Sequence, residues 1–380
     1  MKRGFIFLLL AAMLVTGCSS FGGKEEQNPP EKLQPVNEKV KFSKAWKTSS
    51  GKILKSNRQI QPILVDTTLY TVSTEGLISA FDAESGDKLW SRKLKLKITA
   101  GIGYGDGLLL AGTEDGEVVA LYASNGNPAW VGNAKGGVLA SPAGGQNVVV
   151  VPTSGDKLVG LSATDGTIIW TLSESTPRLL LRGRGRPLVV SDVVLAGFDN
   201  GKLMLVRLDN GQRLWEVRVG DAIGKTEIER LADVDTRPIL INETVYSAAY
   251  QSRVVAIDAP TAKILWENEI STSKDMDADE SNLYAVGESD VIYAINRETG
   301  ETVWEQDELL NRKLTPPAVI NRHIVVGDYQ GYMHVINSAT GEIEARVKTG
   351  SEFLSQPVTR GDSVWVQTLE GDIFAFQLSE

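Results

Sequence analysis

The stretch INRETGETVW, residues 295–304, contains a skeleton that returns along the chain: an apolar residue, a turn rich in Asp, Asn, Ser, Thr and Gly, three residues, and then Trp. It recurs as FDAESGDKLW (81–90), LSATDGTIIW (161–170) and IDAPTAKILW (257–266). Asp or Asn side chains accept hydrogen bonds from backbone amides two or three residues later, and Gly adopts the left-handed conformation that closes such a turn. The skeleton is therefore interpreted as a turn that leads into a strand carrying Trp.

A second element precedes each of these turns: a segment that starts at a tight turn, usually at Gly, and continues with alternating apolar residues. Runs of Val, Ile, Leu and Tyr bounded by Gly, Asn and Asp favour strands over helices. A repeat of about 40 residues with several short strands has the size of one propeller blade. Eight copies of the segment occur: EGLISAFD (75–82), DGEVVALY (115–122), GDKLVGLS (155–162), NGKLMLVR (200–207), QSRVVAID (251–258), SDVIYAIN (289–296), QGYMHVIN (330–337) and EGDIFAFQ (370–377).

Each unit is expected to contain four antiparallel strands. An apolar run such as LLLAG (108–112) is interpreted as the first strand, and the Gly-led segment as the second. The Trp strand is then either the third strand or itself the outermost one. A large indole ring is well suited to fill the seam between neighbouring blades, with its N–H group needing one partner. Seven of the eight Trp residues occupy this position, Ala345 stands there in one unit, and Trp365 lies elsewhere.

The two ends of the repeat indicate how the ring of blades closes. The last unit stops at Glu380, directly after EGDIFAFQ (370–377), without a Trp strand of its own. An unassigned strand, FSKAWKTS (42–49), stands before the first unit. Pairing of these two segments would leave only short, protected strand edges. The sequence therefore predicts an all-β fold, an eight-bladed β-propeller with four-stranded antiparallel blades over residues 42–380, closed by the N-terminal strand in the last blade.

The N-terminus, MKRGFIFLLLAAMLVTGC (1–18), has a basic start and an apolar stretch of signal-peptide length. Its last four residues, Val15-Thr16-Gly17-Cys18, resemble the lipobox of bacterial lipoproteins. This resemblance implies a signal peptide over residues 1–17, cleavage before Cys18, and lipidation of Cys18. Ser19, where Asp would direct a different sorting, implies the outer membrane by the same resemblance. An ordinary secretory signal is the alternative.

The mature chain is expected to face the periplasm from its lipid anchor. Residues 18–41 are polar, contain Gly and Pro, and are interpreted as a flexible tether. Loss of Lys2 and Arg3 lowers the number of basic residues from 39 to 37 against 48 acidic ones, which gives a formal charge of −11. Such a charge argues against a nucleic-acid partner, because general nucleic-acid binders need a basic face.

The Trp repeat also resembles the Trp-docking repeat of quinoprotein dehydrogenases, which hold pyrroloquinoline quinone and calcium in an eight-bladed propeller. This likeness concerns the scaffold, and a fold does not define a function. Those enzymes use an adjacent pair of cysteines, whereas this chain has one, Cys18. Two scattered histidines, His323 and His334, suggest no zinc site. We expect no catalytic residue, metal or cofactor; the alternative is a quinone- and calcium-dependent periplasmic dehydrogenase or a ligand-binding propeller.

Two consecutive connections break the regular spacing: STPRLLLRGRGRP (175–187) and GDAIGKTEIERLADVDTRP (220–238). Both lead from the outer strand of one blade to the inner strand of the next, and insertions on one face of a repeat protein often form its binding face. Apolar side chains among Arg and carboxylate groups are typical of a protein interface. Two alternatives stay open. Residues 179–181 form a strand inside a blade, or the Arg and Asp side chains only bridge the two connections.

Together with the lipobox and the eight Trp units, the segments LLLRG (179–183) and ERLADVDTRP (229–238) make nearly the whole chain similar to BamB-type lipoproteins of the outer-membrane β-barrel assembly machinery. The resemblance implies a non-enzymatic propeller that binds the periplasmic repeats of the central barrel subunit, BamA, and aids folding and insertion of outer-membrane proteins. Unfolded outer-membrane proteins are a second candidate partner, through strand addition at a blade edge. The partner-binding positions that the resemblance implies are Leu179, Leu181, Arg182, Asp233 and Asp235.

Overall fold

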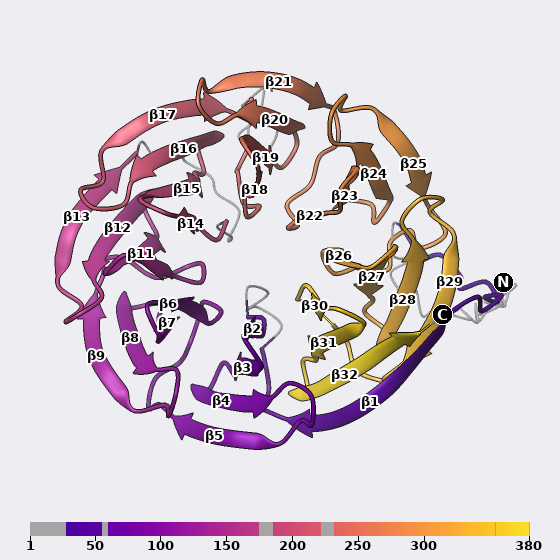
Figure 1. Ribbon diagram of the computed structural model, residues 1–380, viewed down its shortest axis with the longest axis horizontal. Helices are drawn as coiled ribbons and strands as arrows, with labels where there is room; N and C mark the ends of the chain where they lie inside the picture. The colour runs from indigo at the N-terminus through magenta and orange to yellow at the C-terminus, as the bar shows by residue number, and fades with distance from the viewer. Residues whose placement is uncertain (1–27, 55–59, 175–184, 222–231, 354, 380) are drawn as a thin grey trace, which may run out of the picture.

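The computed structural model describes residues 28–54, 60–174, 185–221, 232–353 and 355–379. These ranges contain 32 strands and no helix, and therefore no helix long and apolar enough to cross a bilayer. The strands form eight four-stranded sheets, which Figure 1 shows as blades arranged around a central channel. The prediction of an all-β, eight-bladed propeller is confirmed.

The blades are numbered in chain order, and the strands of each blade are named from the channel outward. Blade 1 consists of β2 (Ile63–Val65), β3 (Thr68–Val72), β4 (Leu77–Asp82) and β5 (Lys88–Lys93). Blade 2 consists of β6 (Gly103–Gly105), β7 (Leu108–Gly112), β8 (Glu117–Tyr122) and β9 (Pro128–Asn133). Blade 3 consists of β10 (Ala143–Gly145), β11 (Val148–Thr153), β12 (Lys157–Ser162) and β13 (Ile168–Ser173). Blade 4 consists of β14 (Leu188–Val190), β15 (Val193–Gly197), β16 (Lys202–Arg207) and β17 (Arg213–Arg218).

The second half of the ring has the same construction. Blade 5 consists of β18 (Ile239–Ile241), β19 (Thr244–Ala248), β20 (Val254–Asp258) and β21 (Lys263–Asn268). Blade 6 consists of β22 (Asp277–Ala278), β23 (Asn282–Val286), β24 (Ile292–Asn296) and β25 (Thr302–Gln306). Blade 7 consists of β26 (Ala318–Ile320), β27 (His323–Gly327), β28 (Tyr332–Asn337) and β29 (Ile343–Lys348). Blade 8 consists of β30 (Val358–Arg360), β31 (Ser363–Gln367), β32 (Asp372–Ser379) and β1 (Lys41–Ser49).

The order of strands within a blade decides between the two interpretations of the Trp strand. The Trp strand is the outermost one, as β5 and β9 show. The apolar run LLLAG is β7, the second strand of its blade, and not the first as expected. The true first strand is β6, which has only three residues. A strand this short carries too little alternation for its pattern to be seen in the sequence.

The predicted closure of the ring is confirmed. Strand β1 pairs antiparallel with β32, from Lys41 opposite Ser379 to Ser49 opposite Asp372, with a register shift between Lys44 and Trp46. In Figure 1 strands β1 and β32, from opposite parts of the sequence, therefore lie side by side in blade 8. Because each blade packs mainly on its two neighbours, closure gives the first and last blades the second neighbour that they need.

The Trp side chains fill the seams between blades, as predicted. The indole N–H of Trp90 in blade 1 donates to the carbonyl oxygen of Ala123 in blade 2 at 3.0 Å. Its ring packs on Gly126, where an added Cβ would lie 2.5 Å from Trp90 Cε3. Seven outer-strand indoles make the same type of bond to the next blade: Trp46 to Ala83, Trp90 to Ala123, Trp130 to Ala163, Trp170 to Leu208, Trp215 to Ala259, Trp266 to Arg297 and Trp304 to Ser338.

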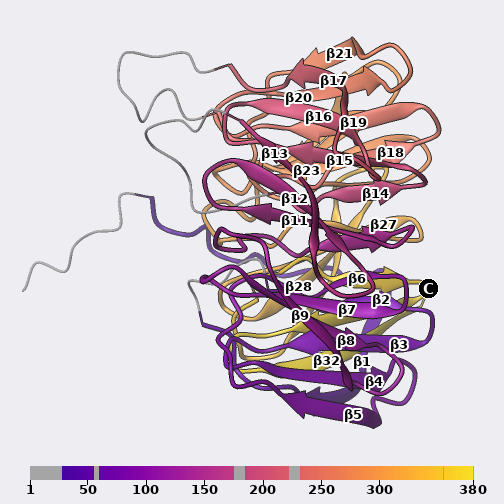
Figure 2. The ribbon, with the colours of Figure 1, turned by 90° about the vertical axis from the view of Figure 1, so that its left-hand side faces the viewer.

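The last part of the expected tether, from residue 28 on, lies against blades 6 and 7. Arg312 Nη1 donates to Glu31 O at 2.8 Å, and Arg346 Nη1 donates to Gln34 O at 2.7 Å. Leu33 packs on the apolar core of blades 6 and 7. Arg312 belongs to a connection between an outer and an inner strand, so this segment begins on the face that carries such connections. Figure 2 shows the ring from the side, with the described start of the chain in indigo along one face.

Candidate partner-binding face and central funnel

The structure describes only part of the predicted site. Leu179, Leu181, Arg182 and the lipidation residue Cys18 lie outside the described residues. Asp233 and Asp235 are described, and these two residues are buried, with 1% and 6% exposure. The roles assigned to these six residues stay predictions: Cys18, Leu179, Leu181, Arg182, Asp233 and Asp235.

The segment that carries the two aspartates is fixed between blades 4 and 5. The backbone N–H of Val234 donates to Phe198 O at 3.3 Å, and the N–H of Tyr250 donates to Asp233 O at 3.0 Å. The Val234 side chain is buried in the apolar core that these two blades share. Asp233 and Asp235 therefore sit on a well-anchored backbone beneath the surface, and not on an exposed loop tip.

The described ends of the two irregular connections touch each other. A Cβ atom added to Gly185 would lie 2.6 Å from Thr236 O and 3.2 Å from the carbonyl carbon of Asp235. Only a residue without a side chain allows this approach of the two backbones. The two connections are thus in contact through their described ends, residues 185–187 and 232–238. We call the connections 175–187 and 220–238 together the binding face, after their predicted role.

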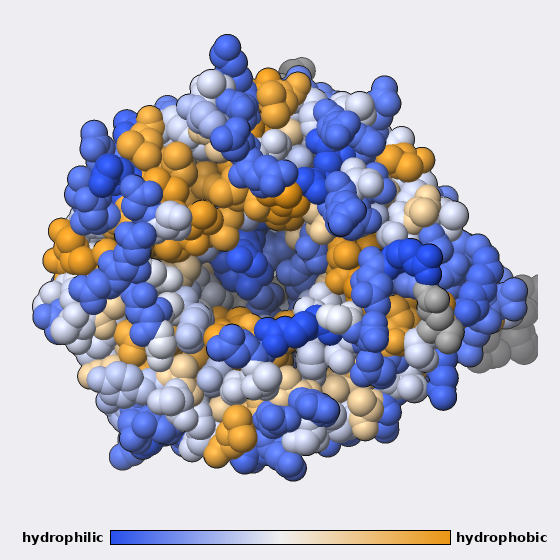
Figure 3. Space-filling model, in the orientation of Figure 1, coloured by the Kyte–Doolittle hydropathy of each residue, from blue (hydrophilic) through white to orange (hydrophobic). Residues whose placement is uncertain are grey.

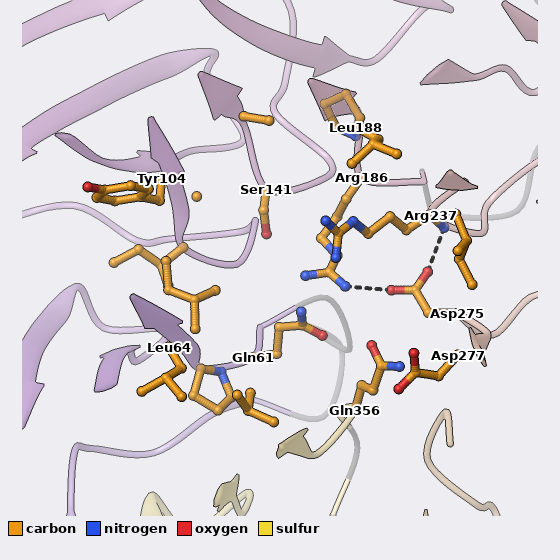
Figure 4. Close-up of a pocket in the computed structure, with 18 of the residues that line it drawn as sticks. Gln61, Leu64, Tyr104, Ser141, Arg186, Leu188, Arg237, Asp275, Asp277 and Gln356 are labelled. Carbon is orange, nitrogen blue, oxygen red and sulfur yellow. Dashed lines mark hydrogen bonds and ion pairs between the residues drawn. The ribbon is translucent and has the colours of Figure 1, made fainter. Parts of the chain in front are cut away.

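Both irregular connections end in Arg-Pro and then enter an inner strand, Arg186-Pro187 before β14 and Arg237-Pro238 before β18. A residue that precedes proline is restricted to extended conformations. Figure 4 shows that the two arginine side chains extend into the central channel. The binding face is therefore joined to the channel through these two residues.

Asp275 links three consecutive connections at the channel wall. Its Oδ2 atom accepts a hydrogen bond from Arg186 Nη2, and its Oδ1 atom accepts one from the backbone N–H of Arg237, both at 2.7 Å. The Arg186–Asp275 ion pair is largely buried, with side-chain exposures of 13% and 16%. Arg186 and Arg237 lie within the two connections that the sequence analysis singled out, but neither was named as a site residue, and Asp275 was not predicted at all. The Arg-Pro pair at the end of both irregular connections is the sequence signal that would have indicated the two arginines.

The channel contains a cavity of about 560 Å³, which we call the funnel. Its polar floor lies where the inner strands begin and is formed by Gln61, Ser141, Arg186, Arg237, Asp275 and Asp277. Its walls carry apolar side chains from the inner strands, among them Leu64, Leu188 and Leu240. Figure 3 shows the hollow at the centre of one face, with hydrophobic surface around it and hydrophilic surface deeper inside.

Burial changes the ionisation of the groups on the floor. Desolvation lowers the pKa of Arg237, and the nearby positive charge of Arg186 lowers it further. The Arg237 side chain is in contact with the solvent of the funnel, but protein atoms surround it and replace much of its hydration. Desolvation also raises the pKa of Asp277, although the backbone N–H groups of Val319 and Ala278 bond to its carboxylate.

Neither histidine is among the residues that line the funnel, and both have protein partners. His334 is fully buried and lies 3.2 Å from Asp328, and His323 lies 2.8 Å from Glu344. In the described ranges, no three residues of the types His, Cys, Asp and Glu come together as metal ligands would. Each of the two histidines is therefore held by a neighbouring carboxylate.

The fold places this chain in the class of Trp-docked eight-bladed β-propellers. A family model described as outer membrane protein assembly factor BamB matches residues 74–306 and 288–379. An outer membrane protein assembly factor BamB of Pseudomonas aeruginosa is 42% identical over 373 residues, which cover 98% of both chains. The chain belongs to the BamB family of outer membrane protein assembly factors. These names describe an assembly factor and not an enzyme, in agreement with the prediction.

Solved structures support the same assignment of the fold. The crystal structure of BamB from Moraxella catarrhalis is similar with a TM-score of 0.81 and 26% identity, over 88% of this chain and 99% of that chain. A europium-containing methanol dehydrogenase has a TM-score of 0.72 at 14% identity, over 88% of this chain and 93% of that chain. The second likeness concerns the propeller fold alone, as the sequence analysis expected for the quinoprotein repeat.

Proposed function

We propose that this chain is a scaffold subunit of the outer-membrane β-barrel assembly machinery. In this proposal, the binding face formed by residues 175–187 and 220–238 holds the periplasmic repeats of the central, BamA-type barrel subunit. Membership of the BamB family carries the proposal. Leu179, Leu181 and Arg182 contact the partner, whereas Asp233 and Asp235, which are buried, position their neighbours from beneath. Unfolded outer-membrane proteins are a second class of partner in the same proposal.

Two structural features support the proposal that both connections act together as one binding face. Gly185 brings the backbones of the two connections into contact, and Asp275 joins both connections to the next one. A surface of this kind is preorganised, so less conformational freedom is lost when a partner binds. Interfaces gain most of their binding energy from a few central residues, and Arg is common among them.

The proposal places the protein on the outer membrane, facing the periplasm. Residues 1–17 act as the signal peptide, and lipidated Cys18 is the anchor, followed by the tether over residues 18–41. Lipid chains on one cysteine hold a protein stably when two or more are present. The docked end of the tether, where Glu31 bonds Arg312, begins on the face that carries the outer-to-inner connections. Anchor and binding face are then on the same side of the ring.

Co-purification from detergent-solubilised outer membranes tests the proposal. The wild-type chain is expected to retain the large barrel-assembly subunit, and Arg182→Glu and Asp235→Asn are expected to lose most of it. Charge reversal at a central interface position such as Arg182 costs about 2 kcal/mol or more, a loss of about thirtyfold in affinity. Asp235→Asn acts indirectly, because it removes a buried charge that positions the neighbouring residues. Each variant is first compared with wild type in its thermal melting, so that loss of folding is recognised.

A matched control uses the opposite face of the ring. Asp192 lies exposed in the turn between β14 and β15, and Asp192→Arg changes the charge there without touching the binding face. This variant is expected to retain the partner like wild type. Equal capture by the wild type, Arg182→Glu and Asp235→Asn would contradict the proposed binding face, and capture of no barrel subunit by wild type would contradict the proposed function.

A further inference from the structure

The floor of the funnel carries two polar groups that the fold itself does not use. Among the described residues, no group accepts a hydrogen bond from the Arg237 guanidinium, whose backbone N–H alone bonds to Asp275. Ser141 is only 3% exposed, and its Oγ atom has no hydrogen-bond partner in the described part of the chain. Figure 4 shows both side chains directed into the cavity. A buried hydroxyl without a partner is costly, and native proteins usually satisfy such groups.

The charges on the floor leave one cation without a close counterion. Arg186 is neutralised by Asp275 at 2.7 Å, and the Gln61 amide faces the same guanidinium. The Asp277 carboxylate accepts two backbone hydrogen bonds, from Ala278 and Val319. Arg237 keeps its charge, because a guanidinium does not deprotonate in proteins. Its free donors therefore face the cavity.

The funnel changes from polar to apolar along its length. Its floor lies at the entry of the inner strands, and Leu64, Leu188 and Leu240 lie further along those strands toward the opposite face. Figure 3 shows the hollow opening on that face, away from the outer-to-inner connections. A cavity of about 560 Å³ is within the usual size of small-molecule sites, which combine apolar walls with a few placed polar groups.

We propose that the funnel binds an apolar molecule or chain end that terminates in a single carboxylate. The carboxylate accepts two N–H bonds from the planar Arg237 guanidinium and one O–H bond from Ser141. The apolar part lies along Leu64, Leu188 and Leu240. A carboxylate matches the planar Arg237 guanidinium, which has no direct ion pair among the described residues. Asp275 and Asp277, whose charges also act on Arg237, would repel a phosphate dianion more strongly than a singly charged group.

Isothermal titration of the purified full-length protein with defined probes tests the site. Octanoate is expected to bind saturably and octanol much more weakly, because the alcohol lacks the charge that Arg237 recognises. The peptide acetyl-Leu-Ala-Leu with a free carboxyl end, compared with its amide, distinguishes a chain end from a free acid as the source of the carboxylate. Inorganic phosphate is expected not to compete.

Variants locate the binding within the funnel. Arg237→Gln is expected to weaken octanoate binding by about tenfold or more, as for hydrogen bonds to charged groups, and Ser141→Ala by about threefold to tenfold, as for one ordinary hydrogen bond. Arg218→Gln removes an exposed arginine on the outer strand β17 and is expected to leave binding unchanged. Failure of both octanoate and the free-carboxyl peptide to bind wild type, or equal binding to Arg237→Gln, would overturn the proposal. Capture of the barrel subunit is measured separately, since this site does not depend on it.

Discussion

Trp46 and Trp365 donate hydrogen bonds to the same acceptor, the carbonyl oxygen of Ala83, at 3.2 and 2.9 Å. Trp46 lies on β1 and Trp365 on β31, so both belong to blade 8, whereas Ala83 belongs to blade 1. This shared acceptor lies in the seam at which the ring closes. Trp365, which lies outside the regular Trp positions of the sequence repeat, therefore reinforces the closure.

The same arrangement occurs in three other blades, with Tyr on the second strand. Tyr70 and Trp90 both donate to Ala123 O, at 3.1 and 3.0 Å. The other two pairs are Tyr246 with Trp266 on Arg297 O, and Tyr284 with Trp304 on Ser338 O. An aromatic residue on the second strand therefore duplicates the seam bond of the outer-strand Trp. The single proton of the Tyr284 hydroxyl is shared between Ser338 O at 3.2 Å and Asp279 Oδ2 at 2.6 Å, so its seam bond is the weaker of the two. Burial and the hydrogen bond to Asp279 raise the pKa of Tyr284 and keep this hydroxyl protonated.

The shared acceptor predicts unequal effects of two similar substitutions. Trp365→Phe removes an N–H bond and part of a ring from a residue that is 5% exposed, and is expected to lower the free energy of unfolding by about 1–3 kcal/mol. Trp46→Phe acts at a partly buried position with the longer bond and is expected to cost less. Urea unfolding followed by circular dichroism measures both. A larger effect of Trp46→Phe would show that β1 alone secures the seam.

Blade 5 has a turn in which Ala262 adopts φ +58°, at the position that Gly300 occupies in the next blade with φ +76°. The left-handed conformation costs a residue with a Cβ about 1–2 kcal/mol. Glycine in turn lowers the free energy of unfolding by about 0.5–1 kcal/mol, because its unfolded chain has more conformational freedom to lose. Ala262→Gly is therefore expected to stabilise the protein slightly, by about 0.5–1 kcal/mol.

Two control substitutions show whether the effect at Ala262 comes from its positive φ. Ala259→Gly lies in the same turn at a residue without positive φ, and is expected to destabilise. Gly300→Ala is expected to destabilise more, because the new Cβ would lie 2.6 Å from Trp266 Cδ2. Thermal melting of the three variants checks the order. A lower melting temperature for Ala262→Gly than for wild type would mean that the alanine methyl contributes more by packing near Trp215 than it costs in strain.

The buried His334 makes stability depend on pH. His334 Nδ1 lies 3.0 Å from Arg346 Nε, which can only donate, so Nδ1 accepts and the ring is neutral with its proton on Nε2 toward Asp328. Burial lowers the pKa of His334 below its usual value of 6.5. The native state therefore binds fewer protons than the unfolded state, and stability is expected to fall as the pH decreases below 6.5.

The contribution of His334 is separable from that of its neighbour. Burial opposes ionisation of Asp328, but hydrogen bonds from His334 and the Tyr332 N–H lower the pKa of this carboxyl below 3.8. The stability that ionised Asp328 contributes is therefore lost only at more acidic pH than the contribution of His334. Urea midpoints between pH 7 and pH 4.5 are expected to fall less steeply in His334→Gln than in wild type. Parallel pH profiles for the two proteins would mean that His334 is not the titrating group.

How far the sequence predicts this structure is clearest in blade 7. The repeat and its period can be recognised in the sequence because most units use the same turn residues followed by Trp at the same spacing. Each outer-strand Trp packs on the turn between the third and fourth strands of the next blade. In blade 8 the fourth strand, β1, comes from the N-terminus, so no such turn connects it to β32. Ala345, in blade 7, therefore stands at the position that Trp occupies in the other blades. A Trp there would have no turn to dock on. The sequence shows the substitution, and only the closed ring shows its reason.

The site was less predictable than the fold. Residues far apart in the sequence, such as Ser141 and Arg237, meet at the funnel floor because their blades lie around one axis. Spacing along the chain does not give the distance between two residues across that axis. The burial of Asp233 and Asp235 could not be predicted from the sequence either, because both lie in a polar segment of the kind that is usually exposed. What the sequence did show was that the repeat is interrupted at these two connections.

Asp275 provides the sharpest test of the link between funnel and binding face. Its carboxylate holds the Arg186 side chain and the Arg237 backbone, and thereby the ends of both irregular connections. Asp275→Ala leaves the buried Arg186 without its ion-pair partner, and removal of one partner from a buried pair is strongly destabilising locally. We expect weaker capture of the barrel subunit, by about fivefold to tenfold, as for loss of one ordinary hydrogen bond, because the change acts on the binding face indirectly.

The matched control removes an ion pair of the same type elsewhere in the ring. Asp372 pairs with Lys47 at 2.8 Å near the closure seam, with side-chain exposures of 28% and 45%, and Asp372→Ala is expected to leave capture unchanged. Titration of each purified variant against the isolated periplasmic repeats gives the affinities, and circular dichroism confirms the fold. If Asp275→Ala binds the periplasmic repeats as tightly as Asp372→Ala does, the funnel floor does not position the binding face. The connections would then keep their shape without the carboxylate that joins them.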